Sequence, residues 1–184
     1  MVFIKGGVSV ISLTGFMFSG KTSAGRVLAK ETGFAFYDID NLIEEKCSMS
    51  VSGIFEKYGE AYFREAERAV VKTLFESGLE KSVVALGGGT ICDRANFEII
   101  NERSLLICLM VPYGEILKRK KELSVSGDTE RPLAAEAENG EFAKLFEDRR
   151  KIYEKARFNI DCSGLGVEEV AVLIKKIIEM KEIN

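Results

Sequence analysis

The chain has 184 residues, of which 46% are hydrophobic and 30% are charged, and its formal net charge is -3. This length and composition are typical of one globular domain with a substantial core. A nucleic-acid partner would need a basic face, which the charge balance does not favour. The sequence contains no histidine, so catalytic triads that use imidazole and metal sites that use histidine ligands are excluded. Any general base must be a carboxylate, a lysine or water.

Apolar runs in this sequence are short. LLICLMV at 105–111 is far below the ~20 residues of a membrane span, and the apolar start of the chain continues into a glycine-rich segment. We therefore expect a cytoplasmic protein with no membrane partner. The four cysteines form no C-x-x-C pair and are expected to be reduced thiols, two or three of them in the core.

Apolar runs alternate with helical patterns along the chain. The pattern predicts strands at 8–13, 34–38, 83–89, 105–111 and 158–161. It predicts helices at 21–32, 41–76 with a break near 48–53, 94–102, 115–122, 142–156 and 167–180. The polar stretch 124–141 is expected to be a mobile surface loop. The alternation predicts an α/β fold, with a parallel sheet of about five strands and helices on both faces, in a single domain over 1–184.

The most specific motif is GFMFSGKTS, from Gly15 to Ser23. It matches G-x-x-x-x-G-K-[ST] and lies between a predicted strand and a predicted helix, which is the context of a phosphate-binding loop. Backbone N–H groups of such a loop converge on phosphate oxygens at a helix N-terminus. Lys21 would reach the β- and γ-phosphates and Thr22 would coordinate Mg²⁺. The sequence has no guanine-reading N-K-x-D, which favours ATP over GTP.

Two carboxylates follow the second predicted strand, at Asp38 and Asp40 in YDID. If the strand geometry persists, both point toward the crevice at the strand ends. One would then serve Mg²⁺ and the other an acceptor hydroxyl. A strand-end aspartate that only caps the next helix is the alternative for Asp38.

Other candidate residues lie further along the chain. Arg64 and Glu67 are spaced i,i+3, so the glutamate can orient the guanidinium, although a surface ion pair would look the same. The glycines at 87–89 suggest close backbone approach to a ligand, with a plain tight turn as the alternative. Arg131 lies in the polar loop, where an arginine can close over transferring phosphate or simply be solvated.

Two arginines in the last third of the chain, Arg149 and Arg150, lie on one predicted helix. Either of them could bind a carboxylate through the planar guanidinium fork.

Taken in order, GFMFSGKTS, YDID, YFREAE, ALGGGT, ERPL and RRKIYEKA resemble shikimate kinase, over most of the chain from about Ser9. The resemblance implies the three-layer P-loop NTPase fold of the nucleoside-monophosphate kinases, with a mobile lid at about 120–140. It implies an ATP-dependent kinase that phosphorylates the 3-hydroxyl of shikimate, in chorismate and aromatic amino-acid biosynthesis. The expected partners are shikimate and ATP, and we expect a monomer.

The resemblance also implies a role for each site residue. ATP would be bound by Gly15, Ser19, Gly20, Lys21, Thr22, Ser23, Arg119 and Arg131, with Arg119 against the adenine and Arg131 on the lid. Thr22 and Asp38 would hold Mg²⁺. Shikimate would be bound by Asp40, Arg64, Gly87, Gly88, Gly89 and Arg149, and the catalytic residues would be Lys21, Asp40 and Arg131. Arg149 is preferred over Arg150 because it stands four residues before Tyr153, which is the family's spacing.

Two features depart from the family pattern. Phe18 stands where the family usually has glycine, and the segment between Arg119 and Arg131 is several residues longer than usual. We expect the Phe18 side chain to turn away from the phosphates, toward solvent or the lid. The alternatives are another small-molecule kinase of the same fold, such as a gluconate or nucleotide kinase, and a non-catalytic ATP-binding regulatory domain.

Overall fold

The computed structural model describes residues 9–125 and 139–182. In this part of the chain, five parallel strands form one sheet in the order β2-β3-β1-β4-β5. The strands are β1 (Val10–Thr14), β2 (Ala35–Asp38), β3 (Ser82–Ala85), β4 (Leu105–Met110) and β5 (Phe158–Asp161). The predicted parallel α/β sheet is therefore confirmed.

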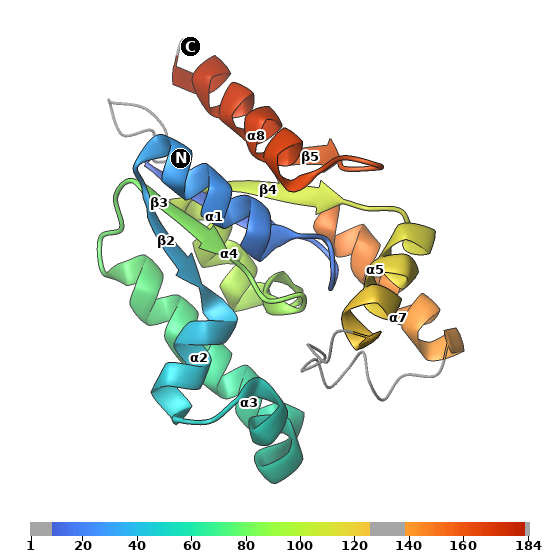
Figure 1. Ribbon diagram of the computed structural model, residues 1–184. Helices are drawn as coiled ribbons and strands as arrows, with labels where there is room; N and C mark the ends of the chain where they lie inside the picture. Colours follow the sequence, from blue (N-terminus) through green and yellow to red (C-terminus); the bar gives the residue numbers. More distant parts are fainter. Residues whose placement is uncertain (1–8, 126–138, 183–184) are drawn as a thin grey trace.

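Helices cover both faces of this sheet (Figure 1). They are α1 (Lys21–Thr32), α2 (Ile39–Cys47), α3 (Val51–Glu76), α4 (Arg94–Arg103), α5 (Tyr113–Val125), α7 (Asn139–Tyr153) and α8 (Val167–Glu182), with a short 3-10 turn η1 (Thr90–Cys92). Helices α1 and α8 pack together on one face, and α3 and α4 pack on the other. None of the helices described is long and apolar enough to cross a membrane.

The central strand β1 is buried along its whole length between β3 and β4. Its side chains Ile11 and Leu13 are fully buried. A strand covered on both faces has a nearly continuous apolar sequence, which is why the sequence identified it. Because β1 is the central strand, the loop that follows it lies at the middle of one edge of the sheet.

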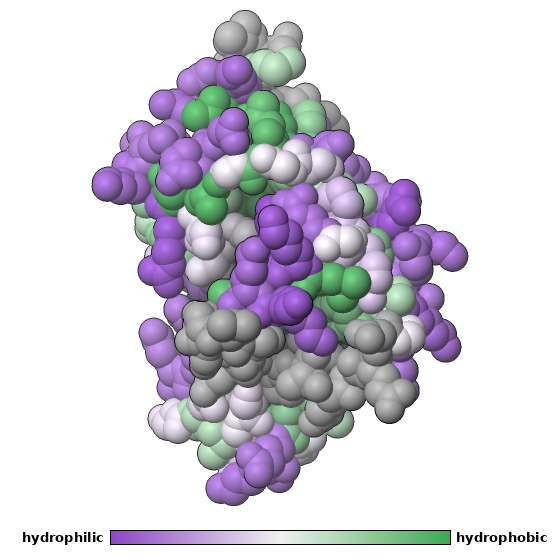
Figure 2. Space-filling model, turned by 45° about the vertical axis from the view of Figure 1, so that its right-hand side comes forward, coloured by the Kyte–Doolittle hydropathy of each residue, from purple (hydrophilic) through white to green (hydrophobic). Residues whose placement is uncertain are grey.

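The molecular surface in the view of Figure 2 is largely hydrophilic, with smaller hydrophobic patches among the polar side chains.

Some element boundaries differ from the prediction. Helix α2 begins at Ile39 rather than at residue 41, because the Asp38 side chain caps it by accepting a hydrogen bond from the backbone N–H of Asp40. Helix α3 is interrupted at Gly59, whose φ of 78° is not helical. Helix α7 begins at Asn139, so the expected loop does not extend to residue 141.

Candidate active site

The loop between β1 and α1 is tightly curved around two glycines. Gly15 has φ 141° and Gly20, which precedes α1, has φ 90°. A Cβ at Gly15 would lie 2.7 Å from the carbonyl oxygen of Leu109 in β4. These positions need glycine because of the backbone angle and the contact with the neighbouring strand.

The Lys21 side chain lies inside this loop and bonds to its backbone. The side chain is buried, and Nζ donates hydrogen bonds to the carbonyl oxygens of Gly15 and Phe16, both at 2.9 Å. The loop is therefore shaped around an ammonium group at the N-terminus of α1. An ammonium group at the N-terminus of a helix, where the first backbone N–H groups have no partner within the helix, is an arrangement suited to an anion such as phosphate.

A cavity of about 600 Å³ lies against this loop, and we call it the loop cavity. Its walls come from residues 18–24, from Arg119 and Leu123 of α5, and from the segment 162–170. Of the residues expected to bind ATP, Ser19, Gly20, Lys21, Thr22, Ser23 and Arg119 line it. Arg131 lies outside the described residues.

Phe18 is buried in the wall of the loop cavity and is only 8% exposed. The expectation was that its side chain turns toward solvent or toward the lid. Burial contradicts the first alternative, and most of the expected lid lies outside the described residues. Leu123 and Val170 line the same cavity, and both belong with Phe18 to the apolar core or pack against it. These residues are more than a hundred positions away in sequence, so the local motif did not indicate the burial.

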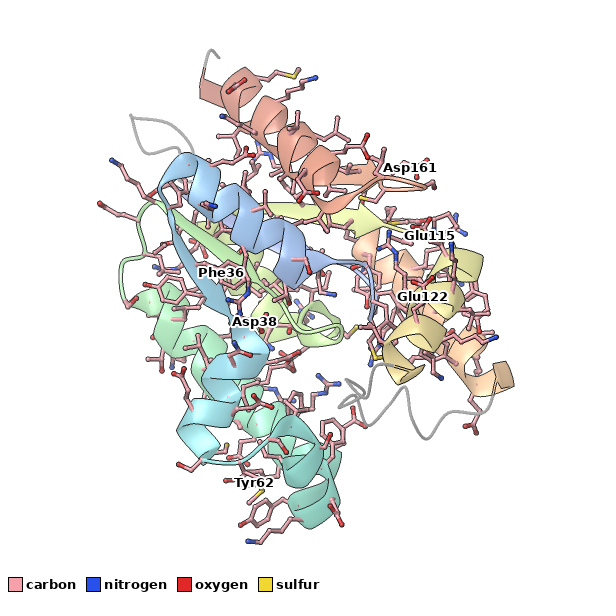
Figure 3. The ribbon with its side chains drawn as sticks, in the orientation of Figure 1. Phe36, Asp38, Tyr62, Glu115, Glu122 and Asp161 are labelled. Carbon is pink, nitrogen blue, oxygen red and sulfur yellow. The ribbon has the colours of Figure 1, made fainter. Side chains whose placement is uncertain are left out.

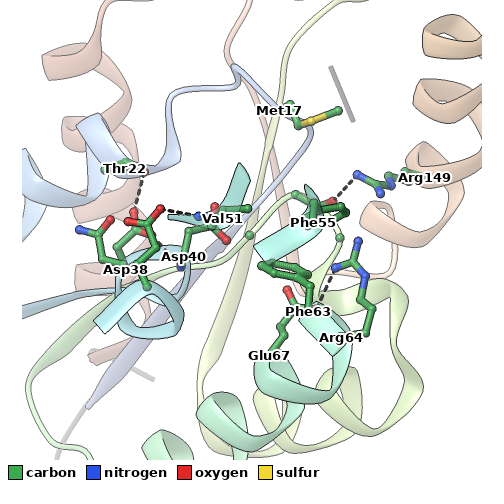
Figure 4. A pocket seen from close by; sticks show the side chains of 15 residues that line it. Met17, Thr22, Asp38, Asp40, Val51, Phe55, Phe63, Arg64, Glu67 and Arg149 are labelled. Atoms are coloured by element: carbon green, nitrogen blue, oxygen red, sulfur yellow. Dashed lines mark hydrogen bonds and ion pairs between the residues drawn. The ribbon is translucent and has the colours of Figure 1, made fainter. Parts of the chain in front are cut away.

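A second cavity, of about 310 Å³, lies beyond the ends of β2 and β3, and we call it the charged cavity. Figure 4 shows Thr22, Asp38 and Asp40 on one side of it and Arg64 and Arg149 on the other. Apolar side chains complete the wall, among them Met17, Phe55 and Phe63. Carboxylates and guanidinium groups thus face one small space from opposite sides.

The strand geometry holds for Asp38 but does not persist to Asp40. Asp38 ends β2, while Asp40 lies in the first turn of α2. Asp38 caps that helix and, through Oδ2, also accepts a hydrogen bond of 2.8 Å from the Thr22 hydroxyl. Capping and a contact with the phosphate-loop threonine therefore occur together. Both aspartates line the charged cavity as expected, but the extended geometry assumed for the pair is wrong at Asp40, which is helical.

Glu67 anchors Arg64 in the charged cavity. Glu67 is 1% exposed and accepts a 2.8 Å hydrogen bond from Arg64 Nη1 and a 2.7 Å hydrogen bond from the Thr90 hydroxyl. Burial disfavours the charge on Arg64, but the carboxylates of Glu67 and Glu60 outweigh it, so the pKa of Arg64 is raised. The Arg64–Glu67 ion pair is therefore buried, and it is not the solvated surface pair that the sequence left as the alternative.

Arg149 faces the cavity, and Arg150 does not. Arg149 is buried and donates a 3.2 Å hydrogen bond to the carbonyl oxygen of Gly88, which also accepts one from the Tyr153 hydroxyl. Arg150 is half exposed and pairs with Glu154 on its own helix. Burial raises the pKa of Tyr153, which keeps that phenol protonated and able to donate.

The three glycines at 87–89 lie against the charged side chains of the site. A Cβ at Gly87 would lie 2.7 Å from an Asp40 carboxylate oxygen, and one at Gly89 would lie 2.7 Å from an Arg64 nitrogen. None of the three has a positive φ. The requirement for glycine here is therefore space for neighbouring side chains rather than a left-handed turn.

Thr22 is the residue that lines both cavities, so the phosphate-binding loop and the charged cavity meet there. The hydroxyl of Thr22 and the carboxylate of Asp38 are hard oxygen donors of the kind that Mg²⁺ takes. No group of three or more His, Cys, Asp or Glu side chains in the described chain could hold a metal alone. This donor set fits Mg²⁺, which usually binds one or two protein groups together with phosphates and waters.

Sequence reasoning missed several residues of the site. Thr90 and Tyr153 position Glu67 and Gly88 through hydroxyl groups, and Glu115 pairs with Arg119 beside the loop cavity. A lone hydroxyl, or an i,i+4 Glu–Arg pair, is common on any helix and carries no signal of its own. These residues are recognised only once the fold brings their partners together.

Comparison with known proteins matches residues 17–180 to the family model described as shikimate kinase. A shikimate kinase of Thermodesulfovibrio yellowstonii is 39% identical over 168 residues, which is 90% of this chain and 92% of the relative. A shikimate kinase structure from Acinetobacter baumannii, in complex with shikimate, has a TM-score of 0.86 at 31% identity and covers 96% of each chain. A thymidylate kinase of Candida albicans, at 15% identity over 95% of this chain and 92% of its own and a TM-score of 0.60, shares the fold alone.

Proposed function

The chain belongs to the shikimate kinase family, and we propose that it transfers the γ-phosphate of ATP to the 3-hydroxyl of shikimate. The products are shikimate 3-phosphate and ADP, in chorismate biosynthesis. The observation that carries the proposal is the meeting of the two cavities at Thr22. A phosphate donor on one side and a small carboxylic acid on the other would bring their reacting groups together at that point.

In this proposal the loop cavity binds ATP. Backbone N–H groups of residues 15–23 surround the phosphates, and Lys21 exchanges its carbonyl partners for phosphate oxygens. Ser19 and Ser23 line the phosphate side, and Arg119 lies against the adenine. Arg131, outside the described residues, is assigned to the closing lid.

Thr22 and Asp38 would hold Mg²⁺, which supplies charge neutralisation and orientation of the phosphates when bound. Their side chains are already joined by a 2.8 Å hydrogen bond, so both donors are oriented toward one place. Two hard oxygen donors at the N-terminus of α1 support this assignment.

The charged cavity binds shikimate. Arg64 and Arg149 bind the carboxylate of the acid, because two guanidinium groups on one wall complement a single anion. Gly87, Gly88 and Gly89 leave room for the ring between these side chains. Asp40, on the opposite wall, binds the hydroxyls and orients the one that attacks (Figure 4).

Phosphoryl transfer needs mainly positioning and charge stabilisation. The acceptor oxygen attacks the γ-phosphorus, the bond to the ADP oxygen breaks, and Asp40 receives the hydroxyl proton. Lys21 and Arg131 stabilise negative charge on the transferred group. The chain supplies each of these groups without histidine.

ADP release in a coupled assay tests this function. With ATP and Mg²⁺ present, shikimate should stimulate ADP release strongly, while gluconate and AMP should leave it near the rate without acceptor. Stimulation by gluconate or AMP but not by shikimate would assign the chain another acceptor. No stimulation by any of the three would refute the proposed reaction.

We also propose that the enzyme works as a cytoplasmic monomer that binds no nucleic acid. Its net charge of -3 supports the last point, since a nucleic-acid surface is basic. Size-exclusion chromatography with light scattering should give a mass near 20.4 kDa. A dimer mass at assay concentration would contradict the monomer.

A further inference from the structure

The loop carries an unusual backbone conformation at Phe18. Its φ is 65°, and only Ser48 and Lys81 share a positive φ among the described non-glycine residues. This left-handed region favours glycine, so a bulky residue must be held there by its surroundings. Burial of the ring in the wall of the loop cavity provides one constraint.

A chain of hydrogen bonds provides a second constraint. Arg119 Nη1 donates to the carbonyl oxygen of Phe18 at 3.2 Å, and Arg119 Nη2 donates to Glu115 Oε1 at 2.5 Å. The second carboxylate oxygen, Glu115 Oε2, accepts a 3.2 Å hydrogen bond from the backbone N–H of Gly164. The Glu115 carboxylate, on α5, therefore contacts the segment after β5 directly and the phosphate-binding loop through Arg119.

These three segments are also three walls of the loop cavity. The phosphate-binding loop contributes Phe18 and α5 contributes Arg119. The segment after β5 contributes Cys162, Leu165 and Gly166, which flank the Gly164 that bonds Glu115. Figure 3 shows Glu115 on α5, facing the end of β5 near Asp161. The Asp161 carboxylate is bonded within its own turn, to the N–H and hydroxyl of Ser163. Glu115 is thus placed to hold the walls together from the side of α5.

We propose that Glu115 is a positioning residue for the nucleotide, and that it acts through Arg119. The ion pair fixes the guanidinium against the Phe18 carbonyl, so the loop and Arg119 are held in one arrangement before the nucleotide binds. Both side chains of the pair are about three-quarters buried, which strengthens the interaction relative to a solvated pair. The inference rests on the proposed function only in taking ATP and ADP as the ligands of this cavity.

Removal of the carboxylate should weaken nucleotide binding and leave acceptor binding unchanged. We expect Glu115→Ala to raise the dissociation constant for Mg-ADP by about tenfold, as measured by calorimetry, because two hydrogen bonds to one charged group are lost. Glu115→Gln should fall in between, since an amide retains only one acceptor oxygen. The KM for shikimate at saturating ATP should change less than about twofold.

Glu98→Ala is the matched control. Glu98 forms the same i,i+4 pair with an arginine, Arg94, but on the exposed surface of α4. Its Mg-ADP affinity should equal that of the wild type. Wild-type affinity in Glu115→Ala, or an equal rise in the KM for shikimate, would overturn the proposal.

A double-mutant cycle tests whether Glu115 acts through Arg119. In an Arg119→Ala background, Glu115→Ala should add less than about threefold to the dissociation constant. The same factor in both backgrounds would overturn the proposal. Failure of the proposed function looks different, because the wild-type protein would then bind Mg-ADP without any shikimate-dependent ADP release, or would not bind it at all.

Discussion

The two cavities that meet at Thr22 are lined by different kinds of chemical groups. The charged cavity is lined by ionised side chains held by other side chains, such as Glu67 on Arg64. The loop cavity is lined by the glycine-lysine loop, whose lysine is bonded to carbonyl oxygens, by apolar side chains, and by Arg119 and Glu122 of α5. A small acid needs recognition by a few precise charges, whereas a triphosphate is bound by many N–H groups.

This difference predicts how each region responds to substitution. In the charged cavity, single side chains make most of the proposed contacts with the acceptor, so removing one of them should change acceptor binding or turnover sharply. The loop cavity spreads its contacts over the backbone, so changes there should alter nucleotide affinity more gradually. Substitutions in the charged cavity test one side of that contrast, and the nucleotide affinity of Glu115→Ala tests the other.

Asp40→Asn should lower kcat by about a hundredfold or more, because an amide cannot take up the proton of the attacking shikimate hydroxyl. The dissociation constant for Mg-ADP should stay at the wild-type value. Steady-state kinetics and calorimetry on the same preparation measure both quantities. Near-normal turnover in this variant would refute the role proposed for Asp40.

Arg149→Ala should raise the KM for shikimate by roughly 10- to 100-fold, because a charge-assisted pair contributes about 1.5–3 kcal/mol. Arg150→Ala is the control, since that arginine is half exposed and pairs with Glu154. Its kinetics should match the wild type. Equal effects of the two substitutions would mean that the carboxylate is bound elsewhere.

Thr90→Val leaves one oxygen of buried Glu67 without its hydroxyl donor. We expect the free energy of unfolding to fall by about 1–3 kcal/mol, with a smaller rise in the KM for shikimate because Arg64 is less firmly held. Urea unfolding measures the first effect, and Thr73→Val, at an exposed position of α3, serves as the control. An unchanged unfolding curve would show that the contact adds nothing to stability.

The smallest expected effect is the pH dependence of stability that comes from one buried thiol, Cys108. Burial raises the pKa of Cys108, in β4 beside the end of β1, to about 12. A raised folded-state pKa favours the protonated form, so its contribution to stability is complete below pH 9 and is lost as pH rises toward 12.

Between pH 8 and pH 10 this one thiol should reduce the free energy of unfolding by about 1 kcal/mol. Cys108→Val should lessen that pH dependence, as followed by urea unfolding at both pH values. The same pH dependence in the variant and the wild type would contradict the assignment to Cys108.

Much of the fold could be predicted because its signals are local. Strand β1 reads as a buried apolar run, and the glycine-lysine motif directly follows it. The beginning of α2 was misplaced because an extended Asp38–Asp40 segment and a capped helix start look alike in sequence. Asp40 still lines the charged cavity, since the first turn of α2 lies just beyond the strand end.

The loop cavity was harder to predict because its contacts join distant parts of the chain. The hydrogen bond between Phe18 and Arg119 spans 101 positions. Glu115 has the same spacing from its arginine as Glu98 and Glu154 have from theirs, with the order reversed, and only the fold places it beside a cavity. Burial of Phe18 likewise depends on α5 and on the segment that leads into α8, which no motif near the loop indicates.

Analysis of the reaction product tests the proposed phosphoryl transfer. The purified protein is incubated with ATP, Mg²⁺ and shikimate, and the product is examined by phosphorus and proton NMR. We expect one phosphate ester, on the 3-hydroxyl of shikimate, formed in equal amount to ADP. Release of inorganic phosphate alone, or an ester on another hydroxyl, would contradict it.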